Sequence, residues 1–279
     1  IMPPMATAKA DNDGRISRDI LDYYDEKSKG GYISLIIIEH SYISKDGKAS
    51  KNQLSVADDS RIDGLGKLAE IIHRNGSKAV MQINHAGSLA RKEVNEAPVG
   101  PSPILNPRKL TDIIPKELNK DEIKEIADNF RKAALRVKKA GFDGVEIHSA
   151  HSYLLNQFIS PMTNRRNDEY GGDIQGRIKI HLEVIKAVRE AVGVGYPVFL
   201  RLGATDDNEA GLTLDDAVKA AQGFEKAGID LIDISGGMCG YIPHNSNEQG
   251  YFSVQSEAIK KAVKIPVILT GGITEPSAA

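Results

Sequence analysis

Cysteine and tryptophan are scarce in this chain of 279 residues, which contains one Cys and no Trp. With Cys239 as the only cysteine, no disulfide can form within the chain, and no iron–sulfur cluster or other cysteine-based metal site is supported. A chain without disulfides suits a reducing compartment, so we expect a cytoplasmic protein. The sequence shows no basic segment followed by an apolar run, so no signal peptide is visible.

An excess of one charge is also lacking. Lys and Arg number 36 and Asp and Glu number 38, which gives a net charge of −2, and the two signs alternate along the chain. Nucleic acids and membrane surfaces attract proteins with basic patches, so we expect neither as a partner. The apolar runs are far shorter than the roughly 20 residues of a membrane span. A small-molecule partner is expected instead, and the oligomeric state stays open, a homo-oligomer included.

Short apolar segments rich in β-branched residues recur along the chain. They show no alternation with polar residues, which is typical of strands buried on both faces. We expect strands at 35–38, 79–83, 144–147, 198–202, 231–234 and 267–269, and the end of another at 1–5. Segments with apolar residues at helical spacing lie between them. They predict helices at 59–74, 121–140, 176–192, 213–227 and 254–263.

This alternation implies parallel strands joined by crossover helices. Seven strands at this spacing predict an α/β fold of the (β/α)8 barrel type that lacks its last β/α unit in this chain. We expect a single domain over 1–279, truncated or incompletely represented at both ends. A doubly wound sheet is the alternative, but no Gly-x-Gly-x-x-Gly follows the first strand. The proline-rich segment 97–115 is expected to cross the mouth of the barrel.

Candidate site residues follow from the fold, because barrel active sites lie at the C-terminal ends of the strands. His148 ends a predicted strand, His151 follows three residues later and Tyr153 two after that. Two histidines could donate hydrogen bonds to one carbonyl oxygen, and a tyrosine could act as an acid. A zinc site is the alternative, but it needs a third ligand, and the spacing is not that of a His-Glu-x-x-His helix.

The surrounding segment, GFDGVEIHSAHSYLLNQFISPMTNRRNDEYGG at 141–172, resembles the fourth strand and following loop of the old yellow enzyme family. The similarity is to the ene-reductase and dienoyl-CoA-reductase-like branch. Other strand ends match in order over essentially the whole chain: PPMAT at 3–7, MQINHAG at 81–87, VFLRLGA at 198–204, DISGG at 233–237 and LTGGI at 269–273. The resemblance implies an FMN-dependent oxidoreductase that passes hydride from NADH or NADPH to the β-carbon of an α,β-unsaturated carbonyl compound.

The resemblance also implies roles for individual residues. His148 and His151 would hold the carbonyl oxygen of the substrate, and Tyr153 would protonate the α-carbon. Gln82 would bind the pyrimidine edge of the flavin, and Arg201 would offset the negative charge of the reduced ring. The implied FMN site consists of Pro4, Met5, Ala6, His40, Gln82, Arg201, Gly271 and Gly272, with the two glycines at the phosphate.

Other interpretations of these residues stay open. The chain could be a flavin-dependent amine or alcohol dehydrogenase, a catalytically weak flavin-binding protein, or a flavin-free barrel enzyme acting on a phosphorylated substrate. Arg201 could pair with a carboxylate such as Glu146, Gln82 could satisfy loop backbone, and Tyr153 could be a core or rim tyrosine. Structural or surface roles are expected for the side chains of His40, His73, His85, His181 and His244. Cys239 is expected to be an inert buried thiol. Arg165 and Arg166 are expected to form ion pairs with Asp168 and Glu169.

Overall fold

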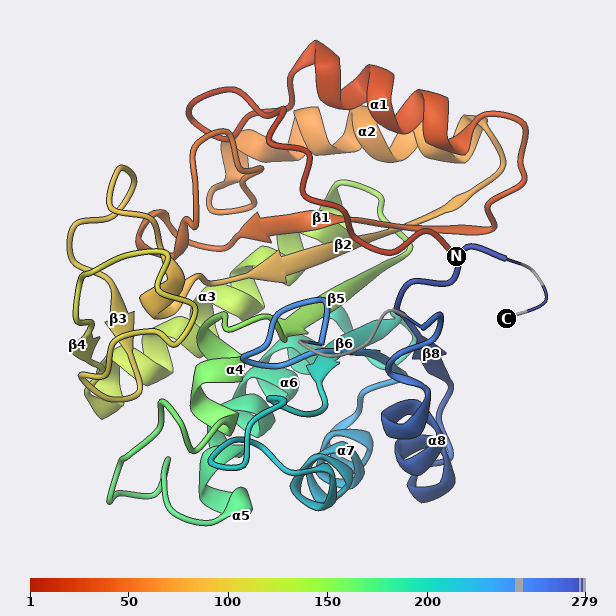
Figure 1. Ribbon diagram of the computed structural model, residues 1–279. Coiled ribbons are helices and arrows are strands. Elements are labelled where there is room, and N and C mark those ends of the chain that lie inside the picture. The colour runs from red at the N-terminus through yellow and green to blue at the C-terminus, as the bar shows by residue number, and fades with distance from the viewer. Residues whose placement is uncertain (244–247, 276, 278–279) are drawn as a thin grey trace.

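The computed structural model describes residues 1–243, 248–275 and 277, and His244 lies outside this part of the chain. A sheet of six parallel strands forms its centre (Figure 1). In spatial order the strands are β1 (Leu35–Tyr42), β2 (Lys78–Asn84), β5 (Gly144–Ser149), β6 (Val198–Gly203), β7 (Leu231–Ser235) and β8 (Val267–Leu269). Beside β1, Met2 forms a parallel bridge to Ile36. All seven expected strands are therefore present, the first as a single bridge.

The first and last edges of this sheet face a common cavity of about 340 Å³. Ile1 and Pro3 line it on the N-terminal side, and Leu269 and Thr270 line it on the β8 side. The sheet thus curves into a barrel whose two edges approach each other, as the sequence predicts.

Five of the helices occupy the predicted segments. They are α2 (Ile62–Arg74), α3 (Lys120–Lys139), α6 (Lys179–Val192), α7 (Leu214–Ala227) and α8 (Ser253–Ala262). A short helix, α5 (Ile174–Arg177), precedes α6 and overlaps the start of the segment predicted at 176–192. The sequence analysis missed α1 (Arg18–Ser28) and α4 (Leu154–Ile159). The apolar pattern of α1 is weak, because only Ile20 and Tyr24 supply buried apolar side chains along its eleven residues.

Local signals fix where the main helices begin and end. Asn119 caps α3 and forms a capping box with Glu122, which satisfies backbone N–H groups of the first turn. Thr213 accepts a hydrogen bond from the N–H of Asp216 at the start of α7. Gly228 ends that helix with a φ of 108°, which a glycine adopts without steric cost.

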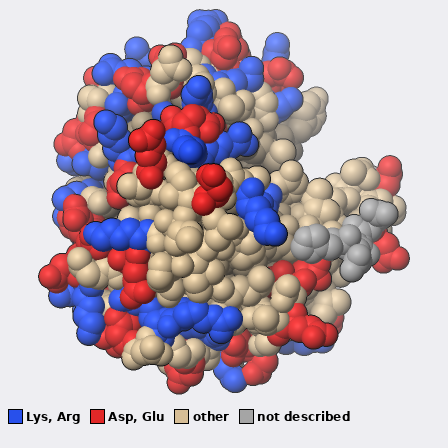
Figure 2. All heavy atoms as spheres, turned by 60° about the vertical axis from the view of Figure 1, so that its left-hand side comes forward, with Lys and Arg blue, Asp and Glu red and all other residues tan. Residues whose placement is uncertain are grey.

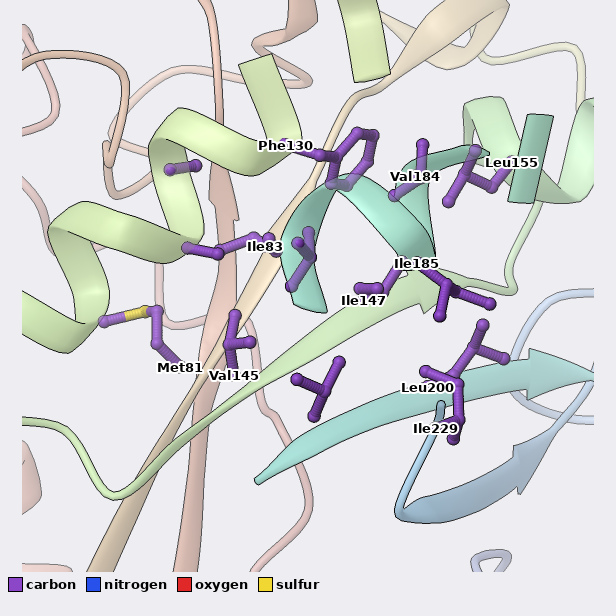
Figure 3. Close-up of a cluster of buried hydrophobic side chains, with 14 of the residues drawn as sticks. Met81, Ile83, Phe130, Val145, Ile147, Leu155, Val184, Ile185, Leu200 and Ile229 are labelled. Carbon is purple, nitrogen blue, oxygen red and sulfur yellow. The ribbon is translucent and has the colours of Figure 1, made fainter. Parts of the chain in front are cut away.

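The core lies between the sheet and the helices that cover it. Figure 3 shows Val145 and Ile147 of β5 together with Phe130 of α3 and Val184 and Ile185 of α6. All five side chains are fully buried. Their packing fixes the position of β5, the strand that carries His148 next to its last residue. Among the described residues, no helix is long and apolar enough to cross a membrane.

The proline-rich segment lies at the C-terminal ends of β1 and β2, on the left of Figure 1. It contains the short strand β3 (Val99–Gly100), which pairs with β4 (Lys116–Glu117) directly after the segment. Figure 2 shows this face of the molecule with acidic and basic side chains interspersed around a largely uncharged middle. The segment therefore adjoins the strand ends where we expected the site.

Candidate active site

His148, His151 and Tyr153 come together at the end of β5. The ring centroid of His148 lies 5.1 Å from that of His151 and 5.0 Å from that of Tyr153. Burial is the main cause that holds the pKa of both histidines well below its usual value, and the charge of Arg201 adds to the effect. Both imidazoles are therefore neutral at neutral pH, so each carries one N–H donor.

The turn that presents His151 and Tyr153 has an unusual backbone. His151 and Ser152 have φ values of 58° and 65°, in the left-handed region that costs a residue with a side chain free energy. Hydrogen bonds hold this turn: the N–H of His151 donates to the carbonyl of Gly236 at 3.1 Å. The N–H of Ser152 donates to Asn156 Oδ1 at 2.8 Å, and Gln157 Nε2 donates to the carbonyl of Ser152 at 2.6 Å. The strain and the bonds that maintain it fix the direction of the two side chains.

The side chain of His40 also belongs to this cluster, which the sequence analysis missed. Its Nε2 lies 3.3 Å from the Tyr153 hydroxyl oxygen, and its Nδ1 lies 2.7 Å from Gln53 Nε2. The amide of Gln53 is oriented by the N–H of Ala49, which donates to Gln53 Oε1 at 2.6 Å. Gln53 Nε2 must then donate to His40 Nδ1, so the single proton of neutral His40 resides on Nε2.

This tautomer has a consequence for Tyr153. His40 Nε2–H donates to the tyrosine oxygen, so the phenolic proton remains available to another acceptor. Burial raises the pKa of Tyr153 to about 12, and burial lowers the pKa of His40 to about 4. At neutral pH Tyr153 is therefore a protonated hydroxyl supported by a neutral histidine.

Four polar side chains form a buried row across the middle of the sheet. The parallel register pairs Gln82 with Glu146 and Arg201 with Asp233. Gln82 Nε2 donates to Glu146 Oε2 at 2.6 Å, and Arg201 Nε lies 3.3 Å from Asp233 Oδ2. Thr270 donates to Asp233 Oδ1 at 2.5 Å. The ion-pair partner of Arg201 is therefore Asp233, not Glu146, because the register puts Asp233 directly beside it.

This row has one arginine for two buried carboxyl groups. Burial, followed by the charge of Asp233, raises the pKa of Glu146 to about 8. Burial also raises the pKa of Asp233. Glu146 Oε1, Asp233 Oδ2 and Arg201 Nε have no hydrogen-bond partner among the described residues. Arg201 Nε and Asp233 Oδ2 face each other as an ion pair, so Glu146 Oε1 is the atom left without a partner. Since an unpaired buried polar atom costs about 1–3 kcal/mol, this oxygen suits a polar ligand that would satisfy it.

The glycine pair after β8 lies beside the same cavity. Gly271 and Gly272 have φ values of 144° and 63°, and a Cβ on either would lie 2.7 Å from the ring of Tyr251. Both positions therefore require glycine. Gly271, Gly272, Pro3 and Asp233 all line the 340 Å³ cavity, so it connects the glycine pair with the N-terminal segment and the buried polar row.

The N-terminal segment is tied to β1 next to this cavity. Thr7 donates to Glu39 through its N–H at 2.5 Å and through its hydroxyl at 2.9 Å. Pro4 is half-buried, and Met5 and Ala6 are exposed. The cavity, the bare glycine backbone and the unpaired oxygen of Glu146 suit a polar ligand with an anionic group, and FMN has this chemistry.

The remaining predicted residues have structural partners in most cases. His73 pairs with Asp143 at 2.6 Å, and His181 is fully buried, 2.8 Å from Ser149 Oγ. Burial raises the pKa of Cys239 to about 11, which agrees with an unreactive thiol. None of these side chains has a role in the reaction proposed below.

The two arginines of the 160–170 loop behave differently. Arg166 pairs with Asp168 at 2.6 Å, as predicted. Arg165 pairs with neither Asp168 nor Glu169 among the described residues, so this part of the expectation was wrong; Glu169 pairs with Lys120 at 2.6 Å instead. Arg165 is exposed and takes part in none of the ion pairs of the described residues.

Together, these features define a parallel α/β barrel with a cavity between its first and last strands and a cluster of histidine and tyrosine side chains at the end of β5. A family model described as "NADH:flavin oxidoreductase / NADH oxidase family" matches residues 1–279. The chain is therefore a member of this family. The resemblance seen in the sequence is thereby confirmed.

Relatives and solved structures agree with this membership. The chain is 42% identical to an NADH oxidase of Thermoanaerobacter brockii, over 100% of its own length and 44% of that protein. It is 39% identical to an NADPH dehydrogenase of Clostridium acetobutylicum, over 99% of its length and 80% of that protein. The chain thus spans less than half of the NADH oxidase.

Two solved structures show the same fold. A complex of 2-naphthoyl-CoA reductase with 2-naphthoyl-CoA superposes with a TM-score of 0.91 at 28% identity, over 99% of this chain and 44% of that chain. An old yellow enzyme homologue from Zymomonas mobilis superposes with a TM-score of 0.85 at 26% identity, over 98% of this chain and 78% of that chain. These matches confirm the barrel, while the roles of individual residues stay predictions.

Proposed function

We propose that this chain is the flavin-binding part of an NAD(P)H oxidoreductase that reduces the C=C bond of α,β-unsaturated carbonyl compounds. The observation that carries this proposal is the pair of neutral histidines beside a protonated tyrosine at the end of β5. FMN, when bound, would supply the hydride chemistry between NADH or NADPH and the β-carbon of the substrate. The protein residues supply binding, orientation and a proton.

His148 and His151 are proposed to hold the carbonyl oxygen. His148 Nδ1 is buried and has no hydrogen-bond partner among the described residues. Ser235 Oγ lies 2.7 Å from His151 Nε2. In the tautomer in which the Ser235 hydroxyl donates to Nε2, the single proton of the ring resides on Nδ1, which is left for the substrate. Two N–H donors aimed at one oxygen stabilise the negative charge that develops there when hydride reaches the β-carbon.

Tyr153 is proposed to protonate the α-carbon. Its hydroxyl accepts a hydrogen bond from His40, so its own proton is free for transfer. Donation from His40 also stabilises the tyrosine oxygen as it loses that proton. Gln53 and His40 therefore position Tyr153, the proposed acid. They also direct its proton to the substrate instead of to His40.

Gln82 and Arg201 are proposed to bind the pyrimidine edge of FMN. Because Glu146 accepts from Gln82 Nε2, the amide oxygen of Gln82 is left for a donor on the ring. The fixed positive charge of Arg201 favours an electron-rich ring. The backbone of Pro4, Met5, Ala6 and His40 would lie along the ring, and the amides of Gly271 and Gly272 would bind the phosphate.

The test is a visible spectrum of the purified protein, recorded anaerobically before and after addition of NADH or NADPH. We expect a flavin band that bleaches with the nicotinamide and returns on addition of 2-cyclohexenone. A colourless protein that cannot be reconstituted with FMN would overturn the proposal. A flavin that an amine or alcohol bleaches, and that NADH and NADPH leave oxidised, would favour an amine or alcohol dehydrogenase.

A further inference from the structure

Arginines are the charged side chains that act on the Tyr153 end of the site. Burial raises the pKa of Tyr153, and Arg108 and Arg91 act against burial by lowering it. Burial lowers the pKa of His151, and Arg201, His40 and Arg108 lower it further. No carboxylate contributes to either shift among the described residues. The electrostatic environment at this end therefore favours an anion.

Arg108 is placed there by a buried asparagine. The N–H of Arg108 donates to Asn106 Oδ1 at 3.1 Å, and Asn106 is 0% exposed. Asn106 Nδ2 donates to Ser88 Oγ at 3.0 Å and to the carbonyl of Ser152 at 3.3 Å. Since Ser152 lies between His151 and Tyr153, the same asparagine ties Arg108 to the turn that carries the proposed catalytic residues.

The guanidinium of Arg108 packs against the loop that follows β7. Gly240 has a φ of 85°, and a Cβ at that position would lie 2.4 Å from Arg108 Nη1. The same loop contributes Gly236, whose carbonyl accepts from the N–H of His151, and Tyr241, whose ring centroid lies 6.2 Å from that of His151. Arg108 is thus held between two segments that both contact the His151 turn.

Arg108 has no acidic partner in the part of the chain that the structure describes. Buried arginines elsewhere have one: Arg166 pairs with Asp168, Arg177 with Asp216 and Arg201 with Asp233. Arg108 is half-buried and Arg91 is exposed, and neither takes part in an ion pair among the described residues. A partly buried cation without a counter-charge is stabilised by an anion that a ligand brings.

We propose that Arg108, assisted by Arg91, determines substrate specificity by binding an anionic oxygen group carried by the unsaturated carbonyl substrate. This inference rests on the proposed function, because it requires the substrate carbonyl to lie at His148 and His151. The preferred substrates are then unsaturated carbonyl compounds that also bear a carboxylate or a similar group, and neutral enones are poorer ones.

The binding test uses the FMN-loaded protein and two phenols that differ in charge, 4-hydroxybenzoate and its methyl ester. Calorimetric titration gives their dissociation constants for the wild type, Arg108→Gln and the control Lys109→Gln. Lys109 is the exposed neighbouring cation, so the control loses the same charge. We expect Arg108→Gln to weaken 4-hydroxybenzoate about tenfold and the ester less than about twofold. Equal weakening of both phenols, or no change in either, would overturn the inference.

The activity test uses trans-4-oxo-2-pentenoate and its methyl ester as oxidants with NADH. Arg108→Gln should lower kcat/KM about tenfold for the acid and leave the ester unchanged. If the variant instead raises the KM for NADH while the acid-to-ester ratio holds, Arg108 binds the nucleotide phosphates, and the substrate assignment is overturned. If neither oxidant reacts with the wild type while Arg108→Gln still separates the two phenols, the proposed function fails and the anion site stands.

Discussion

The buried carboxyl of Glu146 should make the protein less stable as the pH rises. Its folded-state pKa of about 8 lies above the ordinary value of 4.5. Between these pH values the folded chain keeps a proton that the unfolded chain loses. The free energy of unfolding therefore falls by up to about 1.4 kcal/mol for each pH unit, or about 3 kcal/mol from pH 5 to 7.5. Below pH 4.5 this contribution to stability is fully present.

The substitution Glu146→Gln removes this proton and keeps an acceptor for Gln82. We expect a variant that is more stable than the wild type at pH 7.5, with a difference that shrinks toward pH 5. Denaturant unfolding of the flavin-free protein at several pH values measures it. Glu190→Gln removes an exposed carboxyl and should leave the pH dependence as it is. Wild-type and Glu146→Gln curves with equal slopes would refute the assignment of a raised pKa to Glu146.

Three further substitutions test the site. Replacement of both His148 and His151 by Ala should spare FMN binding and lower enone turnover about 10²–10³-fold, measured in stopped-flow reoxidation; unchanged turnover removes the carbonyl role. Tyr153→Phe should slow reoxidation by enones at least about 10²-fold and spare reduction by nicotinamide; equal slowing of both half-reactions would make Tyr153 structural. Gly272→Ala puts a Cβ 2.7 Å from the Tyr251 ring and should weaken FMN binding at least about tenfold in fluorescence titration; unaltered affinity would place the phosphate elsewhere.

The strands were predictable because each is buried on both faces and appears in the sequence as an unbroken apolar run. The amphipathic helices were predictable from their spacing. Helix α1 was not, since its buried face is made of two apolar side chains among charged ones. Helix α4 was missed because all six of its residues are buried, so it has no polar face to reveal the helical period.

The candidate site was predictable only in part. The resemblance pointed to Gln82 and Arg201, and His148 and Tyr153 come close together as expected. The pairing of Arg201 with Asp233 depends on the register between β6 and β7, which no feature of a single strand encodes. The hydrogen bond from His40 to Tyr153 joins residues 113 positions apart, which meet because β2 pairs with both β1 and β5, the strands that carry them to the same edge of the sheet.

The electrostatics divide the site into two ends with different roles. In the row of Gln82 and Arg201, the carboxyl groups of Glu146 and Asp233 offset the positive charge of Arg201. These carboxyl groups can take up or release a proton. At the Tyr153 end, no carboxylate among the described residues offsets the positive charge of Arg108. If His148 and His151 were charged, they would add two positive charges between these arginines. They would then attract an anion by charge alone, whatever the direction in which it lies from the rings. Burial keeps both histidines neutral, so their contribution is a directed N–H donor, and the recognition of charge is left to Arg108.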